Sequence, residues 1–373
     1  MAKPPFTVPY NYLPEQFADV QKFFALWEPL IRSGEFTLGP YVEEFETQFA
    51  QFVGSRHCIS TNNGTDALIL SLKSLGIGPG DDVITACNSF YATAGAIVAV
   101  GARPVFADVD SRYQLDVDSA RSVLTERTRA ILPVHWAGAS PDMDQVRKFA
   151  DSHGLYVVED ACMGIGGSIR GQHPGTFGQV GAFSMHPLKS LNVMGDGGMV
   201  VTDDDDLASW MRKYRNHGMI DRDHIEMWGV NMRLQPLQAV VASHILDQIP
   251  GIIAQRGANA AILDEALRPL APHVILPDRR SDFTETYSLY IIQVDRRDEL
   301  LTHLQDHSID AKIHYPIPLH LQPATEGSQR SLPLAEQQAN RIITLPIHQY
   351  LDEKQLALMS TTIARFFSPL TER

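Results

Sequence analysis

The chain of 373 residues contains only three cysteines, Cys58, Cys87 and Cys162. Their number is odd, and their spacing matches neither a disulfide framework nor a zinc site. We therefore expect reduced thiols, a cytoplasmic location and no bound metal. The sequence also has no low-complexity segment that would indicate disorder.

Long apolar runs are absent as well. The start, Met1–Pro5, lacks the apolar stretch of a signal peptide, and no later segment reaches the roughly 20 apolar residues that a membrane span needs. Positive charge is scarce. The chain has 31 Lys and Arg residues against 44 Asp and Glu residues, which gives a net charge of -13 at pH 7. This balance disfavours nucleic acid as a partner. We expect a soluble protein that binds small molecules, with no membrane or nucleic-acid partner.

The chain does have enough apolar residues, 44%, for a substantial core. In its first two-thirds, short β-rich runs alternate with helical patterns such as 66–75 and 141–153. This alternation is typical of a mostly parallel sheet covered on both faces. The seven expected strands are His57–Ser60, Val83–Ala86, Val105–Val109, Ala130–His135, Tyr156–Glu159, Gly181–Ser184 and Met199–Thr202.

The pattern changes in the last third of the chain. A long helical region, 235–270, is interrupted by Pro250–Gly251, and β-like runs follow at 287–294 and 311–315. We expect this change to mark a domain boundary. The predicted division is an N-terminal segment and large α/β domain at 1–249 and a smaller C-terminal α/β domain at 250–373.

Lys189 is the most informative residue. It follows a short apolar strand and lies on a turn that ends in Gly195–Gly198. An amine placed there can form a Schiff base with an aldehyde, which makes Lys189 a candidate anchor for pyridoxal phosphate. A lone loop lysine is more often a solvated charge, so this interpretation depends on finding the rest of a cofactor site.

Ligands in open α/β sheets bind beyond the carboxyl ends of the strands. Asp160 ends one strand, where its carboxylate can pair with a protonated pyridine nitrogen or simply cap the next turn. The turn 63–66 joins a strand to a helix whose free N–H groups suit a phosphate, although an ordinary N-cap gives the same pattern. Phe90 can stack on a flat cofactor or pack in the core.

Taken in order along the chain, the phosphate turn, Phe90, Asp160, Ser184 and Lys189 follow the layout of a fold type I pyridoxal-phosphate enzyme. The chain resembles the DegT/DnrJ/StrS family of sugar aminotransferases. This resemblance implies an aspartate-aminotransferase-like fold. It is carried by Phe36–Pro40, Asn62–Leu68, Gly76–Asp81, Val158–Ala161, Lys189–Gly198, Asn231–Arg233, Gln238–Ala239, His314–His320 and Leu345–His348.

The resemblance also implies roles for individual residues. Lys189 would carry pyridoxal phosphate and act as the base, and Asp160 would keep the pyridine nitrogen protonated. Asn231 would enter the site of a neighbouring subunit and complete its phosphate contacts, so a homodimer with shared active sites is implied. The remaining cofactor contacts would come from Gly64, Thr65 and Asp66, mainly through backbone N–H groups, from the Ser184 hydroxyl, and from Phe90 stacked on the ring.

The reaction implied is a two-step transamination. An amino donor, L-glutamate by analogy, would load the cofactor, and a nucleotide-linked 3- or 4-keto-(deoxy)hexose would accept the amine in amino-sugar biosynthesis. A keto-cyclitol acceptor stays open. For the negative charge of the nucleotide we favour Arg233 over Lys213 and Arg215. Tyr315 and His320 fall in a segment that tends to line the sugar site, but ordinary loop roles for both are equally open.

Two other functions compete with transamination. A dehydratase of the same fold carries His in place of the Schiff-base lysine, so Lys189 argues against it. A non-catalytic regulatory protein has no need of the complete set of cofactor residues. One position departs from the family pattern, because Met163 stands where relatives commonly carry a Gln that binds the cofactor's ring hydroxyl. A thioether is only a weak acceptor and donates nothing.

Two further patterns are given structural interpretations. The turn at Gly195–Gly198 precedes a strand rather than a helix, so we do not expect a dinucleotide site there. The acidic run Asp203–Asp206 is expected to form a solvated turn or helix start rather than a metal site.

Overall fold

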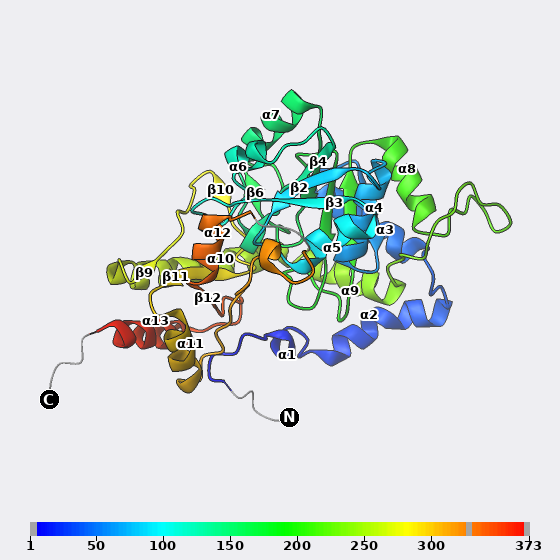
Figure 1. The fold of residues 1–373 in the computed structure, drawn as a ribbon. Coiled ribbons are helices and arrows are strands. Elements are labelled where there is room, and N and C mark those ends of the chain that lie inside the picture. The colour runs from blue at the N-terminus through cyan, green and yellow to red at the C-terminus, as the bar shows by residue number, and fades with distance from the viewer. Residues whose placement is uncertain (1–5, 326–329, 369–373) are drawn as a thin grey trace.

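The computed structural model describes residues 6–325 and 330–368. Helices cover both faces of a central sheet, and a smaller sheet lies beside it with the last helices of the chain (Figure 1). Two consecutive residues of strand β2 (Asp82–Ala86), Val83 and Ile84, point to opposite faces of the sheet and pack in different apolar clusters. Val83 packs in a cluster with Leu68, whereas Ile84 packs in another cluster with Phe149. Both clusters are buried, which explains why the strands are apolar on both faces.

The central sheet has seven strands in the order β1-β8-β7-β5-β4-β2-β3. Strand β8 runs antiparallel to both of its neighbours, and the other pairs are parallel. The predicted mostly parallel seven-stranded sheet is confirmed. The strands are β1 (His57–Thr61), β2 (Asp82–Ala86), β3 (Arg103–Ala107), β4 (Thr128–Leu132), β5 (Tyr156–Asp160), β7 (Val180–Ser184) and β8 (Gly198–Thr202).

The helices around this sheet begin and end at residues suited to those positions. In α7 (Met143–His153), the side chain of Asp142 accepts a hydrogen bond from the Gln145 N–H, and Gly154 ends the helix in a left-handed conformation. The predicted helices at 66–75 and 141–153 are confirmed. The others here are α1 (Leu13–Gln16), α2 (Val20–Ser33), α3 (Pro40–Val53), α4 (Gly64–Ser74), α5 (Tyr91–Ala99), α6 (Val117–Ser122), α8 (Asp205–Tyr214) and α9 (Pro236–Leu246).

The long helical region breaks at a different place from the one predicted. Helix α9 ends at Leu246 and α10 (Ile249–Leu267) begins two residues before Gly251. The predicted break at Pro250–Gly251 is therefore wrong. Pro250 lies in the first turn of α10, where its missing N–H removes no intrahelical bond.

The smaller sheet has the strand order β12-β11-β9 and is antiparallel. The β-like run at 287–294 contains β11 (Tyr290–Val294), but the run at 311–315 forms no strand. Only Lys312 pairs with a neighbour, Thr344, before the chain leaves the sheet. The other elements of this part are β9 (Val274–Ile275), β12 (Ile342–Leu345), α11 (Arg297–Asp306), α12 (Pro333–Ala339) and α13 (Glu353–Phe367); a two-stranded ribbon pairs β6 (Ser168–Ile169) with β10 (Phe283–Thr284).

Helix α10 contributes to two apolar clusters. Its first part, with Ile249 and Ile253, packs among residues of α3, α9 and the central sheet. Its later part, with Ala260 and Leu267, packs against β11 and α13 together with Val8 from the start of the described chain. The division into 1–249 and 250–373 stays a prediction. Among the described residues, no single helix is long and apolar enough to cross a membrane, although α9 and α10, bent by 58°, pass that test as a pair.

Candidate active site

A cavity of about 230 Å³ lies at the carboxyl ends of the parallel strands. Strands β5 and β7 are parallel neighbours, so their last residues, Asp160 and Ser184, reach the same edge of the sheet. The cavity collects predicted site residues from five separate segments. Those that line it are Gly64, Thr65, Phe90, Asp160, Ser184, Lys189 and Tyr315.

Lys189 is held by its own backbone. Its N–H donates to the His186 carbonyl at 2.8 Å, and its carbonyl accepts from the Tyr12 hydroxyl at 2.9 Å and from Asn192 Nδ2 at 3.2 Å. Burial lowers the pKa of the Lys189 amine, and the nearby Asp160 carboxylate opposes that shift only in part. Burial therefore shifts this amine towards the unprotonated form that can act as a nucleophile.

Asp160 is buried with both carboxylate oxygens engaged. Oδ2 accepts from Thr93 Oγ1 at 2.7 Å, and Oδ1 accepts from the Cys162 N–H at 3.2 Å. Thr93 lies in turn 2.6 Å from Ser89 Oγ. The sequence prediction missed Thr93, although it lies only three residues after Phe90. These contacts fix the direction in which the carboxylate faces the cavity.

The start of α4 has the geometry of an anion site. The Asn63 side chain accepts from the Asp66 N–H at 2.8 Å and donates to Asp66 Oδ2 at 3.0 Å, so Asp66 is engaged in capping and does not line the cavity. The N–H groups of Gly64 and Thr65 have no intrahelical acceptor. A Cβ on Gly64 would lie 2.7 Å from the Cβ of Ser184. This close approach explains the glycine and brings the Ser184 hydroxyl beside the helix start.

Aromatic rings line the cavity. Phe90 is 47% exposed, and its ring centroid lies 6.0 Å from that of Tyr315, which is 5.6 Å from that of Trp136. Burial raises the pKa of Tyr315 to about 12, so its phenol stays protonated at neutral pH. Trp136 was not predicted. It directly follows the expected strand at 130–135. Because ligands bind beyond the carboxyl ends of strands, this position could have indicated Trp136 as a site residue.

Besides Asp66, three predicted site residues do not line the cavity. His320 is buried, its Nε2 is 3.1 Å from Glu336 Oε1, and it does not line the cavity, which favours the loop role left open for it. Asn231 and Arg233 are joined to each other, because Arg233 Nε donates to Asn231 Oδ1 at 3.0 Å. Arg233 also donates to Asn216 Oδ1 at 3.1 Å, and neither residue lines the cavity of its own chain.

The less favoured cations, Lys213 and Arg215, already have partners. Lys213 pairs with Glu226 at 2.8 Å, and Arg215 is buried against Glu46 and the Ser60 carbonyl. Met163 does line the cavity. Its carbonyl accepts from Thr286 Oγ1 and Ser288 Oγ, while its thioether offers the cavity no strong hydrogen bond.

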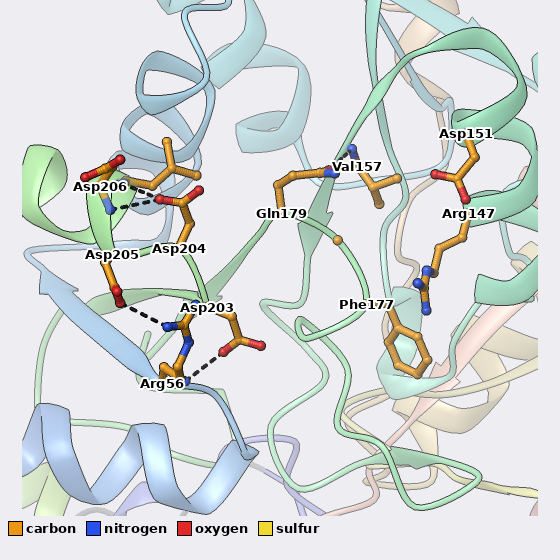
Figure 2. A pocket seen from close by; sticks show the side chains of 12 residues that line it. Arg56, Arg147, Asp151, Val157, Phe177, Gln179, Asp203, Asp204, Asp205 and Asp206 are labelled. Atoms are coloured by element: carbon orange, nitrogen blue, oxygen red, sulfur yellow. Dashed lines mark hydrogen bonds and ion pairs between the residues drawn. The ribbon is translucent and has the colours of Figure 1, made fainter.

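A second, open depression lies at the opposite edge of the central sheet, where β5 and β7 begin (Figure 2). It holds none of the predicted site residues. Its acidic run starts α8, because Asp204 accepts from the N–H groups of Asp206 and Leu207, and Asp205 pairs with Arg56 at 3.2 Å. The interpretation of this run as a helix start is confirmed. Within the described ranges, no three His, Cys, Asp or Glu side chains are grouped so as to hold a metal ion.

The sheet order and the cavity with Lys189 and Asp160 define the class, a pyridoxal-phosphate-dependent aminotransferase of fold type I. The residues fit the cofactor: an amine whose pKa burial lowers, a carboxylate held in one direction, and a helix start with two free N–H groups share one cavity. The chain belongs to the DegT/DnrJ/EryC1/StrS aminotransferase family, whose family model matches residues 19–363.

Two curated relatives span most of the chain. A dTDP-3-amino-3,4,6-trideoxy-alpha-D-glucose transaminase of Streptomyces venezuelae is 40% identical over 87% of this chain and 87% of its own. A protein of Geobacillus stearothermophilus named as a pleiotropic regulatory protein is 36% identical over 96% of this chain and 98% of its own. The names attached to similar chains therefore include both an enzyme and a regulator.

Two solved structures support the fold and the cofactor. The structure of S. venezuelae DesV in complex with a ketimine intermediate has a TM-score of 0.94 at 37% identity, covering 97% of this chain and 99% of that chain. A Bacillus subtilis structure, ntda with bound cofactor PMP, has a TM-score of 0.89 at 26% identity, covering 97% of this chain and 87% of that chain. Both likenesses extend over nearly the whole described fold.

Proposed function

We propose that the protein transfers an amino group from L-glutamate to a nucleotide-linked 3- or 4-keto-(deoxy)hexose in amino-sugar biosynthesis. The observation that carries this proposal is one shared cavity, which is lined by Lys189, by Asp160 and by aromatic rings. The name of the S. venezuelae relative, a dTDP-amino-sugar transaminase, supports the substrate class.

Lys189 and Asp160 have separate tasks in this proposal. Bound pyridoxal phosphate supplies an electron sink for the bond changes at the substrate carbon. Lys189, with its pKa lowered by burial, takes and returns a proton at that carbon in both halves of the reaction. Asp160, held by Thr93, keeps a proton on the pyridine nitrogen through an ion pair.

The remaining cofactor contacts follow from the local geometry. The N–H groups of Gly64 and Thr65 and the hydroxyl of Ser184 would bind the phosphate, and Phe90 would cover the ring. Asp66 is left out because its N–H is bonded to Asn63. Tyr315 stays in the proposal as a sugar contact because it lines the cavity. His320 is left out because its ring contacts Glu336.

We also propose a homodimer in which Asn231 and Arg233 act on the partner's site. Asn231 ends the segment 216–231 and Arg233 follows it two residues later, and neither lines the cavity of its own chain. This segment presents large apolar side chains to solvent, with Trp228 88% and Ile220 62% exposed. Apolar exposure of this kind marks an interaction surface, and a second copy is its natural partner.

The wider setting is part of the same proposal. The three cysteines are free, which supports a reducing, cytoplasmic location. The net charge of -13 disfavours nucleic acid, and we propose no membrane partner.

Absorbance of the bound cofactor tests the proposal. We expect the purified protein reconstituted with pyridoxal phosphate to show a visible band that L-glutamate bleaches and a keto-sugar nucleotide restores. Lys189→Ala is the matched control and should lack the band while still binding the cofactor. A panel of 3- and 4-keto-sugar nucleotides and a keto-cyclitol identifies the acceptor.

Each rival has its own outcome in this assay. Restoration of the band by the cyclitol alone contradicts the nucleotide-sugar substrate. Loss of a sugar hydroxyl without amine transfer indicates a dehydratase. A reconstituted wild-type protein whose cofactor never responds to any amino donor supports the regulatory alternative.

A further inference from the structure

Arg256, in α10, is a buried cation without a counter-ion. Its side chain is 2% exposed, and no carboxylate pairs with it anywhere in residues 6–325 and 330–368. Nε donates to Gln349 Oε1 at 3.1 Å, whereas Nη2 is buried with no hydrogen-bond partner. An unpaired buried guanidinium is costly, and an anion bound beside it would offset that cost.

A small side cavity of about 20 Å³ provides the space for that anion. Arg256 lines it together with Tyr12 and Ile347. Tyr10 and Leu188 line both this side cavity and the active-site cavity, so the two adjoin. The side cavity is also linked to the backbone of Lys189. The guanidinium stands 5.2 Å over the Tyr12 ring, and the Tyr12 hydroxyl donates to the carbonyl of Lys189.

The chemistry of the side cavity suits one carboxylate. A guanidinium binds the two oxygens of a carboxylate with parallel hydrogen bonds, and Arg256 has nitrogen donors to spare. Burial raises the pKa of the Tyr10 phenol, which therefore stays a hydrogen-bond donor. Burial also lowers the pKa of His348 to about 4, so Arg256 supplies the positive charge among these lining residues. A diphosphate is much larger than this space.

The position of the side cavity decides which carboxylate it can take. A carboxylate attached to the reacting carbon must lie in the same cavity as Lys189. Arg256 does not line that cavity but the one beside it. A carboxylate separated from the reacting carbon by two methylene groups can extend from the active-site cavity into the side cavity. We propose that Arg256 binds the distal carboxylate of a dicarboxylic amino donor and selects that donor; this rests on the proposed transamination.

The test compares amino donors in the first half-reaction, followed by bleaching of the cofactor band in the holoenzyme. We expect the wild type to prefer L-glutamate to L-alanine, which lacks the distal carboxylate. Arg256→Met should raise the KM for glutamate by roughly 100-fold and leave kcat and the reaction with alanine little changed. Arg256→Lys should recover part of the loss. Arg268→Gln, an exposed arginine just after α10, is the matched control and should behave as wild type.

Binding without chemistry gives a second readout. Glutarate, a dicarboxylate without an amine, should raise the melting temperature of the wild-type holoenzyme, and butyrate should not. If Arg256→Met does not fold, the single variant Tyr10→Phe is measured instead and should bind glutarate more weakly than wild type. Glutamate selectivity that survives in Arg256→Met, or equal effects of glutarate and butyrate, overturns the inference. A cofactor band that no donor bleaches overturns the proposed function instead.

Discussion

The hydroxyl of Thr93 donates a 2.7 Å hydrogen bond to Oδ2 of Asp160 and thereby fixes the carboxylate that faces the cofactor cavity. Thr93 comes from α5 and Asp160 from the end of β5, so the contact joins two elements distant in sequence. Ser89 Oγ, 2.6 Å from the Thr93 hydroxyl, extends the contact into a short chain of hydrogen bonds.

Replacing Thr93 by Val should weaken cofactor binding without abolishing it. The substitution keeps the side-chain shape and removes a hydrogen bond to a charged group, which is worth about 1.5–3 kcal/mol. We expect roughly a 10-fold or greater rise in the dissociation constant of pyridoxal phosphate, measured by absorbance titration. Thr93→Ser keeps the hydroxyl and is the control. Equal affinities for Thr93→Val and wild type would show that Asp160 needs no such support.

Adding a methyl group at Gly64 should disrupt the phosphate end of the site. The new Cβ would lie 2.7 Å from the Cβ of Ser184, so the start of α4 or the end of β7 must shift. We expect Gly64→Ala to lose at least 10-fold in cofactor affinity while the apo protein stays folded. Gly95→Ala, in α5 with open space around it, is the control and should bind normally. Normal binding by Gly64→Ala would remove this turn from the phosphate site.

Acid should destabilise the fold partly through His173. Burial lowers its pKa to about 4, below the ordinary value of 6.5, so in this pH range the unfolded chain binds the proton first. Stability contributed by the neutral ring is complete above pH 6.5 and is lost as pH falls towards 4. We expect the urea midpoint of His173→Gln to fall less steeply than that of wild type across this window. A parallel decline in both proteins would assign the acid sensitivity to other groups.

The apolar side chains on the segment 216–231 should control assembly. If a second copy covers Trp228 and Ile220, the double variant Trp228→Ser/Ile220→Ser should sediment as a monomer at concentrations where wild type is a dimer. Loss of the partner's Asn231 should also lower cofactor affinity in that variant. Ile262→Ser, an exposed residue of α10, is the control. A variant that stays dimeric would place the interface elsewhere.

Glu159 should be essential for stability rather than for chemistry. It is fully buried and accepts from the N–H groups of Gly175, Phe177 and Gly178 at 2.6–2.8 Å, while its Oε2 lies 2.8 Å from His135 Nε2. Glu159→Gln replaces one acceptor oxygen by a donor that faces other donors. We expect a loss of about 2–4 kcal/mol in the free energy of unfolding, measured with urea. Asp142→Asn, a half-exposed cap of α7, should cost much less.

The strands were predictable because both faces of the central sheet are covered, so each strand is a largely apolar run, and β5 and β7 end at polar residues. This also made Asp160 and Ser184 recognisable, since the end of a strand is where a ligand can lie. Pro250 misled the prediction of the helix break, because sequence alone does not say whether a proline stands in the first turn or in the interior of a helix.

Other site residues gave no local signal. Thr93 matters only through a contact with a strand far away in sequence, and Arg256 lies in a helical stretch where an arginine is expected to face solvent. Asn231 and Arg233 were predicted from the family resemblance, and neither lines the cavity of its own chain, so their roles stay a prediction. Such placements depend on tertiary packing, which periodicity does not encode.

Helix α10 is anchored at one end beneath the central sheet and at the other end beneath the small one, and Arg256 lies between the two anchors. Arg256 is therefore held in the middle of a helix whose two ends are fixed in different apolar cores. The helix that joins the two cores is thus also the helix that carries the proposed donor-binding side chain.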